Sequence, residues 1–450
     1  MLLFFLYIIL QLSIFNNIYN HFKMTYTQAS IITIGDELLI GQVIDTNSAW
    51  MAQALNKVGI RVARRVAVGD VWQEIWNALD EESNHADIIL ITGGLGPTAD
   101  DITKPLLCKY FNGTMIVHQP TLEHVTHIFE NILKRPMIES NIKQAEVPNC
   151  CTVLPNNNGT APGMWFSKKM NALGNEKIFV SMPGVPFEMK GIMLETVIPK
   201  LLQQFSFPYI VHQTLLTAGI GESFLAAQLI DFEAALPATI KLAYLPNYGL
   251  VRLRLTGTST NKDAIEKEVQ QQFEQLQYLV HEHMVVAKDA TMQQVVAEML
   301  THKQQTLCTA ESCTGGYIAH LLTKDAGASK YYNGSVVSYS YQAKEDVLQV
   351  DKNILNSKGA VCEDVVIQMA KGALMHFKTH YSIAVSGIMG PSGGTQDKPV
   401  GTVWVAVANA EKVKTQKFNF RFERTRNIDL TAVNALNMLR LFMLETDIVK

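Results

Sequence analysis

The chain has 450 residues, of which 48% are hydrophobic and 18% charged, which predicts a globular protein of two or three domains. Its formal net charge of −3 argues against binding to nucleic acid, because a phosphate backbone requires a basic surface. The six cysteines show neither a C-x-x-C pair nor a zinc-like spacing with histidine, which is typical of reduced thiols in a cytosolic protein.

Residues 1–23 differ in composition from the rest of the chain. The run MLLFFLYIILQLSIF lacks the basic start and the small-residue cleavage site of a signal peptide. It is also shorter than the roughly 20 apolar residues that a membrane span needs. Met24 opens MTYTQASIITIGDELL, which is typical of a cytosolic start. We therefore predict that residues 1–23 reflect an upstream start codon, and that the protein is cytoplasmic and makes no membrane contact.

Residues 24–205 alternate between apolar runs and helical patterns. Buried strands are predicted at 31–34 and 87–92, a further strand at 61–68, and an amphipathic helix that ends at Gly59. Alternating strands and helices with continuously apolar strands favour a parallel sheet that is covered on both faces. The region therefore predicts a doubly wound α/β domain.

Residues 206–288 show a different pattern. The stretch 249–257, GLVRLRLTG, alternates like a half-exposed strand, and 264–280, AIEKEVQQQFEQLQYLV, is a polar amphipathic helix. These patterns predict a small α+β connector. From residue 289 the alternation of strands and helices resumes and continues to residue 450, which predicts a second α/β domain.

Two segments of the first domain follow predicted strands, namely GDELLIGQVIDTN (35–47) and TGGLGPTADDITK (92–104). Ligands of open parallel sheets bind outside the carboxyl ends of the strands, so both segments should line one crevice. Its glycines let backbone N–H groups approach an anion. Its carboxylates could hold Mg²⁺ against phosphates; they are Asp36, Glu37, Asp45, Asp100 and Asp101. Alternatively, the glycines form a tight turn and Asp100 caps a helix, and the ordinary dinucleotide-binding motif is absent after the first strand.

The stretch TLCTAESCTGG (306–316) places Ser312, Cys313 and Thr314 between a short apolar strand and a helix. At such a turn a serine nucleophile would be exposed and would benefit from the helix dipole. Alternatively, these side chains simply cap the helix. Cys313 has no evident histidine partner and is interpreted as a packing residue.

A serine nucleophile needs a base, and the histidines of the C-terminal third lie in ordinary helical patterns. The stretch VVSYSYQAK (336–344) offers Tyr339 and Lys344 instead. A lysine desolvated beside a serine can lose its proton near neutral pH and act as the base. The alternative for Lys344 is a solvated residue at the start of a helix.

A glycine-rich loop follows a further predicted strand, within SGIMGPSGGTQDKPVGTVWVAV (386–407). This loop is longer than a hairpin needs, and it could bring backbone N–H groups close to a phosphate or a ribose. Alternatively, the loop is purely connective. The following RFERTRN (421–427) contains arginines that can grip a phosphate.

These motifs together resemble a known family. GDELLxGxxxDTN with TGGLGPTxDD is similar to the molybdopterin-binding domain of molybdenum-cofactor biosynthesis proteins, and the ending GPTADD resembles the N-terminal half of the competence/damage-inducible protein A (CinA) family. GIGES (219–223) and AYLPNYGLVRLRLTG (243–257) resemble that family's middle region. AESCTGG, YSxxxK and SGIxGPxGGTxxKPVGTV resemble its C-terminal nicotinamide-nucleotide amidase domain. The resemblance covers the chain from Met24 onward.

For the C-terminal domain, the resemblance implies hydrolysis of nicotinamide mononucleotide to nicotinate mononucleotide and ammonia, without a cofactor. It implies that Ser312 is the nucleophile, Lys344 the base and Tyr339 the partner of Lys344. Backbone N–H groups near 314–316 would stabilise the oxyanion. The substrate-binding residues would be Thr314, Gly315, Gly316, Ser329, Gly390, Gly393, Gly394, Thr395 and Arg424. Tyr341 departs from the family pattern, because a small polar residue, often asparagine, usually stands there.

For the N-terminal domain, the resemblance implies either an ADP-ribose pyrophosphatase that uses Mg²⁺ or another divalent cation, or a non-catalytic nucleotide- or pterin-binding module. Its ligand-binding residues would be Asp36, Glu37, Asn47, Gly93, Gly94, Gly96 and Thr98. The metal ligands would be Asp100 and Asp101. The expected partner is a small-molecule nucleotide substrate, and the expected assembly is a homodimer.

Overall fold

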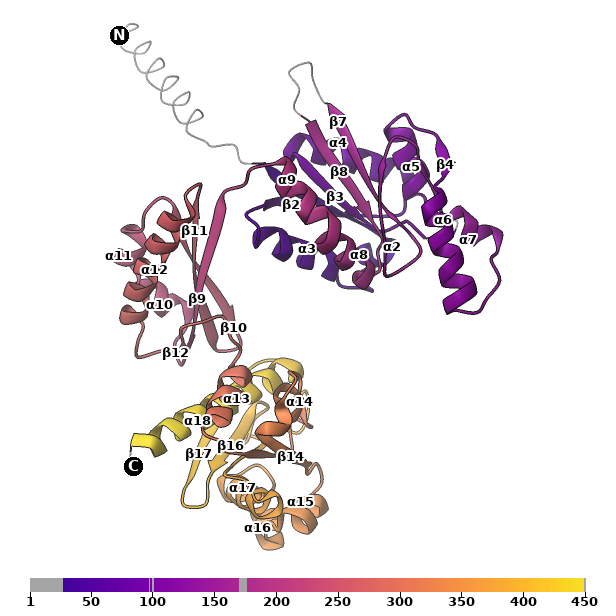
Figure 1. The fold of residues 1–450 in the computed structure, drawn as a ribbon. Helices are drawn as coiled ribbons and strands as arrows, with labels where there is room; N and C mark the ends of the chain where they lie inside the picture. Colours follow the sequence, from indigo (N-terminus) through magenta and orange to yellow (C-terminus); the bar gives the residue numbers. More distant parts are fainter. Residues whose placement is uncertain (1–26, 97, 99–100, 170–175, 449–450) are drawn as a thin grey trace, which may run out of the picture. The chain divides into compact units, whose positions relative to one another are not determined.

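The computed structural model describes residues 27–96, 98, 101–169 and 176–448 (Figure 1). The extension 1–23 and the predicted metal ligand Asp100 therefore lie outside the described residues. The chain divides into two compact units, one formed by residues up to 210 with 258–263 and the other by 211–257 with 264–450. Across the described residues, no helix combines the length and the apolar character that crossing a membrane demands.

The first unit contains a six-stranded sheet with the order β2-β1-β3-β8-β7-β6. The first four strands of this order run parallel, whereas β7 is antiparallel to both of its neighbours. The strands are β1 (Gln28–Ile34), β2 (Arg61–Val68), β3 (Ile88–Thr92), β6 (Thr152–Leu154), β7 (Gly163–Lys169) and β8 (Glu176–Met182). The predicted doubly wound α/β domain is confirmed, with one antiparallel strand added to the parallel sheet.

Helices cover both faces of this sheet, because each presents an apolar stripe to it. One core joins the sheet to α3, α8 and α9, and the other joins it to α4 and α5. The helices are α2 (Asp36–Leu39), α3 (Thr46–Asn56), α4 (Trp72–His85), α5 (Thr103–Tyr110), α6 (Gln119–Thr126), η1 (His127–Ile132), α7 (Glu139–Lys143), α8 (Pro186–Ile192), η2 (Met193–Val197) and α9 (Ile198–Gln204). A separate two-stranded ribbon pairs β4 (Met115–Val117) with β5 (Glu146–Pro148).

The middle region forms a four-stranded sheet with the order β10-β11-β9-β12. Its strands are β9 (Tyr209–Ala218), β10 (Ile240–Asn247), β11 (Leu250–Ser259) and β12 (Met284–Val286). Its helices are α10 (Glu222–Gln228), α11 (Ile230–Ala234) and α12 (Lys262–Leu279). The alternating side chains of β11 place Val251, Leu253 and Leu255 in a core with the apolar stripe of α12.

The C-terminal region forms a five-stranded sheet with the order β14-β13-β15-β16-β17, in which β14, β13 and β15 are parallel. Its strands are β13 (Leu307–Glu311), β14 (Tyr332–Val337), β15 (Tyr381–Gly387), β16 (Thr402–Ala408) and β17 (Val413–Asn419). Its helices are α13 (Met292–His302), α14 (Tyr317–Thr323), η3 (Ala328–Lys330), α15 (Tyr341–Leu348), α16 (Lys352–Lys358), α17 (Glu363–Phe377) and α18 (Arg424–Ile448). Helices α13, α14 and α18 pack on one face and α15, α16 and α17 on the other.

Candidate functional site

Three parallel strands of the C-terminal sheet run toward the same sheet edge, with β15 continuing to Gly387. Glu311, the last residue of β13, lies opposite Val337 of β14 and Val385 of β15. The N–H of Ser312 donates to Val385 O at 3.1 Å, and the N–H of Ser338 donates to Glu311 O at 2.9 Å. The ladder therefore brings the residues that follow the strands together at one sheet edge, as expected for a ligand site of an α/β domain.

Lys344 reaches this edge from α15, which Ser340 caps by accepting a hydrogen bond from the N–H of Ala343. The Lys344 side chain is only 1% exposed. Its Nζ donates to Ser312 Oγ at 2.9 Å and to Ser338 O at 2.6 Å. Burial disfavours the charged form of an amine and lowers the pKa of Lys344 to about 8. The alternative of a solvated lysine is therefore wrong.

Cys313, the next residue after Ser312, borders the same cavity as that serine and also packs into the core. Its side chain is buried in the core cluster that also contains Ile318 and Met389. Burial raises the pKa of the Cys313 thiol to about 12, so the thiolate that a nucleophilic cysteine requires is disfavoured. The geometry agrees with the interpretation of Cys313 as a packing residue.

The turn after Ser312 is held in a way that the sequence did not predict. Gly315 and Gly316 have φ of +61° and +96°, a region that favours glycine, and Gly316 rather than Thr314 is the residue at the start of α14. The Thr314 hydroxyl and the Gly316 N–H instead donate to the buried carboxylate of Glu311, at 2.7 and 3.1 Å. The alternative that Thr314 caps the helix is therefore wrong.

The same contacts revise the expected oxyanion site. The N–H of Gly315 donates to Ser312 O at 3.2 Å, and the N–H of Gly316 is bound to Glu311. The backbone N–H groups of Cys313 and Thr314 remain as candidates on this turn. The sequence did offer a signal for the role of Glu311. It places a glutamate at the end of a mostly apolar strand, and a charge buried there needs hydrogen-bond partners nearby.

Ser312 and Lys344 open into a cavity of about 190 Å³. The cavity is lined by Ser312, Cys313, Tyr339, Lys344, Ala360, Val361, Ser386, Gly387, Met389 and Arg424. The sequence did not predict the wall formed by Ala360, whose backbone O accepts from Ser386 Oγ at 2.8 Å and whose N–H donates to the Tyr341 hydroxyl at 3.2 Å. The unusual Tyr341 therefore supports a wall of the cavity.

Tyr339 lines this cavity but is 66% exposed. Its hydroxyl accepts a hydrogen bond from Arg424 at 3.4 Å, while the hydrogen bonds of Lys344 go to Ser312 and Ser338. Arg424 also donates to Gly390 O at 2.9 Å. The structure thus pairs Tyr339 with Arg424 rather than with Lys344.

Several expected substrate-binding residues lie away from the residues that line the cavity. Ser329 is exposed on η3. Thr395 closes a turn with Lys398 inside the glycine-rich loop, through its N–H and its hydroxyl. Gly390, Gly393 and Gly394 belong to the same loop as Thr395. Among the described contacts of these four loop residues, only the contact of Gly390 with Arg424 leads to the cavity.

The N-terminal domain has its own cavity, of about 530 Å³, at the carboxyl ends of its strands. Of the residues expected to bind a ligand, the cavity is lined by Glu37, Gly93, Gly94 and Gly96. The others take different contacts: the Asn47 side chain donates to Gly184 O at 2.7 Å, Asp36 accepts from the N–H of Asp70 at 3.1 Å, and Thr98 contacts Asp101. The sequence did not predict the lining residues Asp70, Gln144 and Glu188.

Asp101 lines the N-terminal cavity and organises its glycine loop. Its carboxylate accepts from the N–H groups of Gly96 and Thr98 at 2.8 and 2.9 Å, and α5 begins two residues later, at Thr103. Within the described ranges, no three His, Cys, Asp or Glu side chains are grouped so that they could hold a metal ion. A divalent cation at Asp101 stays a prediction.

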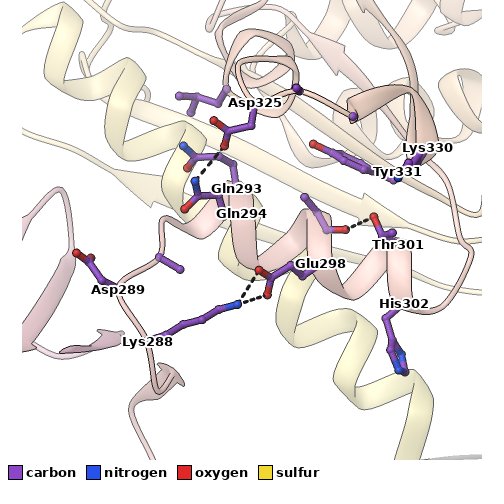
Figure 2. A pocket seen from close by; sticks show the side chains of 15 residues that line it. Lys288, Asp289, Gln293, Gln294, Glu298, Thr301, His302, Asp325, Lys330 and Tyr331 are labelled. Carbon is purple, nitrogen blue, oxygen red and sulfur yellow. Dashed lines mark hydrogen bonds and ion pairs between the residues drawn. The ribbon is translucent and has the colours of Figure 1, made fainter. Parts of the chain in front are cut away.

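Another cavity, of about 660 Å³, lies along α13 (Figure 2). Two pairs of its charged and amide side chains bind each other: Lys288 pairs with Glu298, and Gln294 donates to Asp325. The lining residues offer no serine or cysteine. The smaller cavity at Ser312 is therefore the better candidate for chemistry.

Three family models match the chain. The probable molybdopterin binding domain matches residues 30–203, the damage-inducible protein CinA KH domain matches 212–284, and the CinA C-terminal domain matches 289–443. Together these matches account for most of the chain.

Relatives match over nearly their whole length. A CinA-like protein of Cytophaga hutchinsonii is 44% identical over 416 residues, which cover 92% of this chain and 98% of that protein. A CinA-like protein of Flavobacterium psychrophilum is 43% identical and covers 92% and 97%. A solved structure of a competence/damage inducible protein from Agrobacterium tumefaciens is 36% identical, with a TM-score of 0.33, and covers 33% of this chain and 92% of that one. The chain therefore belongs to the CinA family.

Proposed function

We propose that the C-terminal domain hydrolyses the carboxamide of nicotinamide mononucleotide to nicotinate mononucleotide and ammonia. The observation that carries this proposal is the buried amine of Lys344, 2.9 Å from Ser312 Oγ at the wall of a cavity. A serine becomes a nucleophile when an adjacent base takes its proton, and a lysine with a pKa lowered to about 8 can be that base near neutral pH.

In the first half of the proposed reaction, Ser312 Oγ attacks the carboxamide carbon while Lys344 Nζ takes the hydroxyl proton. The carbonyl oxygen gains negative charge, which the backbone N–H groups of Cys313 and Thr314 would stabilise. The tetrahedral intermediate then breaks its C–N bond. Lys344 returns its proton to the leaving nitrogen, so that ammonia departs and an ester joins the nicotinoyl group to Ser312.

In the second half, a water molecule replaces ammonia in the cavity. Neutral Lys344 takes a proton from this water, and the resulting hydroxide attacks the ester carbon. Breaking the ester bond releases nicotinate mononucleotide, and Lys344 protonates Ser312 Oγ, which restores the starting state. One residue thus serves as base and as acid in each half.

The cavity also offers a positive charge for the phosphate of the substrate. Arg424 lies at the cavity wall and is the first residue of the 25-residue helix α18. The N-terminus of a helix and a guanidinium group both favour a phosphate. This arrangement supports a nucleotide rather than an uncharged amide as the substrate.

The test is an assay of the purified protein with nicotinamide mononucleotide, in which ammonia and nicotinate mononucleotide are measured together. Equal amounts of both products, formed equally well with a chelator present, are expected. Free nicotinamide, which lacks the phosphate, should react poorly. Absence of both products with folded protein would overturn the proposal.

A second function is proposed for the N-terminal domain, as a site for a phosphate-bearing nucleotide such as ADP-ribose or for a pterin. The glycine loop 93–96 and the carboxylates of Glu37 and Asp101 line one cavity. Backbone N–H groups of such a loop suit a phosphate; those of Gly93 and Gly96 donate to Met182 O and Asp101, so the candidates are Gly94 and Leu95. A Mg²⁺ ion carried by phosphates needs only one or two protein carboxylates, and Glu37 and Asp101 are the candidates. Calorimetry with ADP-ribose, with and without Mg²⁺, tests this proposal. Heat that saturates with added ligand indicates binding, whereas heat that continues only when Mg²⁺ is present indicates cleavage.

A further inference from the structure

Glu311 is a buried carboxylate that the proposed reaction does not use. Its side chain is 0% exposed, and it immediately precedes Ser312. The carboxylate accepts hydrogen bonds from two hydroxyl groups and three backbone N–H groups. The donors are Thr309 Oγ1 (3.2 Å), Thr314 Oγ1 (2.7 Å), Gly316 N (3.1 Å), Ile318 N (3.0 Å) and Ala319 N (2.8 Å).

These contacts replace the usual cap of a helix. Helix α14 begins after the left-handed Gly316, which has no side chain that could cap it. The first N–H groups of a helix have no partner within the helix and need an external acceptor. Glu311 supplies that acceptor from the preceding strand, so it ties β13 to α14 across the turn that carries Ser312.

The backbone of Glu311 connects the same turn to Lys344. Glu311 O accepts the N–H of Ser338 at 2.9 Å, and Ser338 O accepts a hydrogen bond from Lys344 Nζ at 2.6 Å. Glu311 therefore contacts, on one side, the turn of the nucleophile and, on the other, the residue that anchors the base. The positions of both Ser312 and Lys344, which are 2.9 Å apart, therefore depend on hydrogen bonds made by Glu311.

We propose that Glu311 is a positioning residue whose carboxylate holds the turn 312–316 so that Ser312 Oγ stays against Lys344 Nζ. This inference rests on the proposed amidase function. The carboxylate also lies at the positive end of α14, where an anion is stabilised by the helix dipole and by hydrogen bonds from the backbone N–H groups. Because the first N–H groups of α14 donate to Glu311, the helix dipole stabilises this carboxylate and not Ser312. The activation of Ser312 therefore depends on Lys344.

The test is Glu311→Gln in the full chain. An amide keeps the shape but places an NH₂ group where one oxygen stood, and each oxygen accepts at least one backbone N–H. Either orientation of the amide therefore sets a donor against a donor. A displacement of the turn by about 1 Å should lower kcat by about 100-fold. KM for nicotinamide mononucleotide should change little, because Glu311 does not line the cavity.

The matched control is Glu82→Gln, which alters an equally buried glutamate of the other domain, bound by Ser30 and Arg64. It should leave kcat and KM unchanged. A folded Glu311→Gln protein with wild-type kcat, or one in which only KM rises, would overturn the inference. If wild-type protein does not deamidate nicotinamide mononucleotide, the proposed function fails instead.

A milder variant decides the matter if Glu311→Gln does not fold. Thr314→Val removes one of the hydroxyl donors to Glu311 and leaves the carboxylate in place. We expect kcat to fall several-fold at constant KM, because the turn loses part of its support. An unchanged kcat, or a rise in KM alone, would contradict a positioning role and point to a direct contact between Thr314 and the substrate.

Discussion

The two cavities differ in what their ionisable groups do. In the C-terminal cavity, the amine of Lys344 is buried and contacts the hydroxyl of Ser312. In the N-terminal cavity, Asp101 is bound by backbone N–H groups of its own loop, and Glu188 accepts from the amide of Asn156. A buried base beside a nucleophile suits bond cleavage, whereas carboxylates and glycine N–H groups around an open cavity suit the binding of a ligand.

The largest expected effect is on the nucleophile. Ser312→Ala should lower kcat for nicotinamide mononucleotide by about 1,000-fold or more, because covalent catalysis is lost. Lys344→Met should lower it by a similar factor, since a nucleophile and its base act as a unit. Steady-state ammonia release measures both variants. An additive loss in the double variant would show that the two residues act independently.

The pH dependence sharpens the same point. The proposed base must be neutral, and the pKa of Lys344 is lowered to about 8. Below that pH the rate should therefore rise about tenfold per pH unit, and it should level off above it. A pH profile of kcat/KM measures this. A profile that is flat between pH 6 and pH 9 would exclude Lys344 as the base.

Asp101→Asn tests whether the two cavities work separately. The variant weakens the acceptor for the N–H groups of Gly96 and Thr98, so the affinity of the N-terminal domain for ADP-ribose should fall about tenfold, or 1.4 kcal/mol. Calorimetry measures the affinity, and the deamidation rate serves as the control. Loss of deamidation in a folded variant would reveal coupling between the domains.

Lys344→Met should also stabilise the protein at neutral pH. Because burial lowers the pKa of Lys344 below the value of an exposed lysine, the folded state binds this proton less tightly than the unfolded state does. The wild-type protein should therefore gain stability as the pH rises from about 8 toward 10.5, and the methionine variant should lack this gain. At pH 7 the free energy of unfolding of the variant should exceed that of the wild type by about 1 kcal/mol, which thermal unfolding measures as a higher melting temperature.

The smallest effect is expected at Cys313. Cys313→Ala removes a buried thiol whose pKa is raised to about 12, so kcat should be nearly unchanged. The loss of packing should cost about 1 kcal/mol in the free energy of unfolding. Denaturant titration and the deamidation assay measure the two quantities. An inactive Cys313→Ala beside an active Ser312→Ala would make the cysteine the nucleophile.

Much of the architecture was predictable because its signals are local. The continuously apolar run at β3 and the alternation in β11 indicate strands, and the apolar spacing in α12 indicates a helix. The same local pattern placed Ser312 between the end of an apolar strand and the start of a helix. Hydrophobic periodicity carries this information because it reflects the face that each element buries.

The sequence alone determined which residues could take part in the chemistry, whereas the tertiary structure decided which of them meet. Lys344 could have been solvated, since only the packing of α15 against the sheet buries it. Tyr339 meets Arg424, which lies 85 positions later in the chain, and Glu311 meets the start of α14. Burial, and with it the pKa of an ionisable group, depends on every element packed around that group. The pattern of neighbours along the chain does not contain this information.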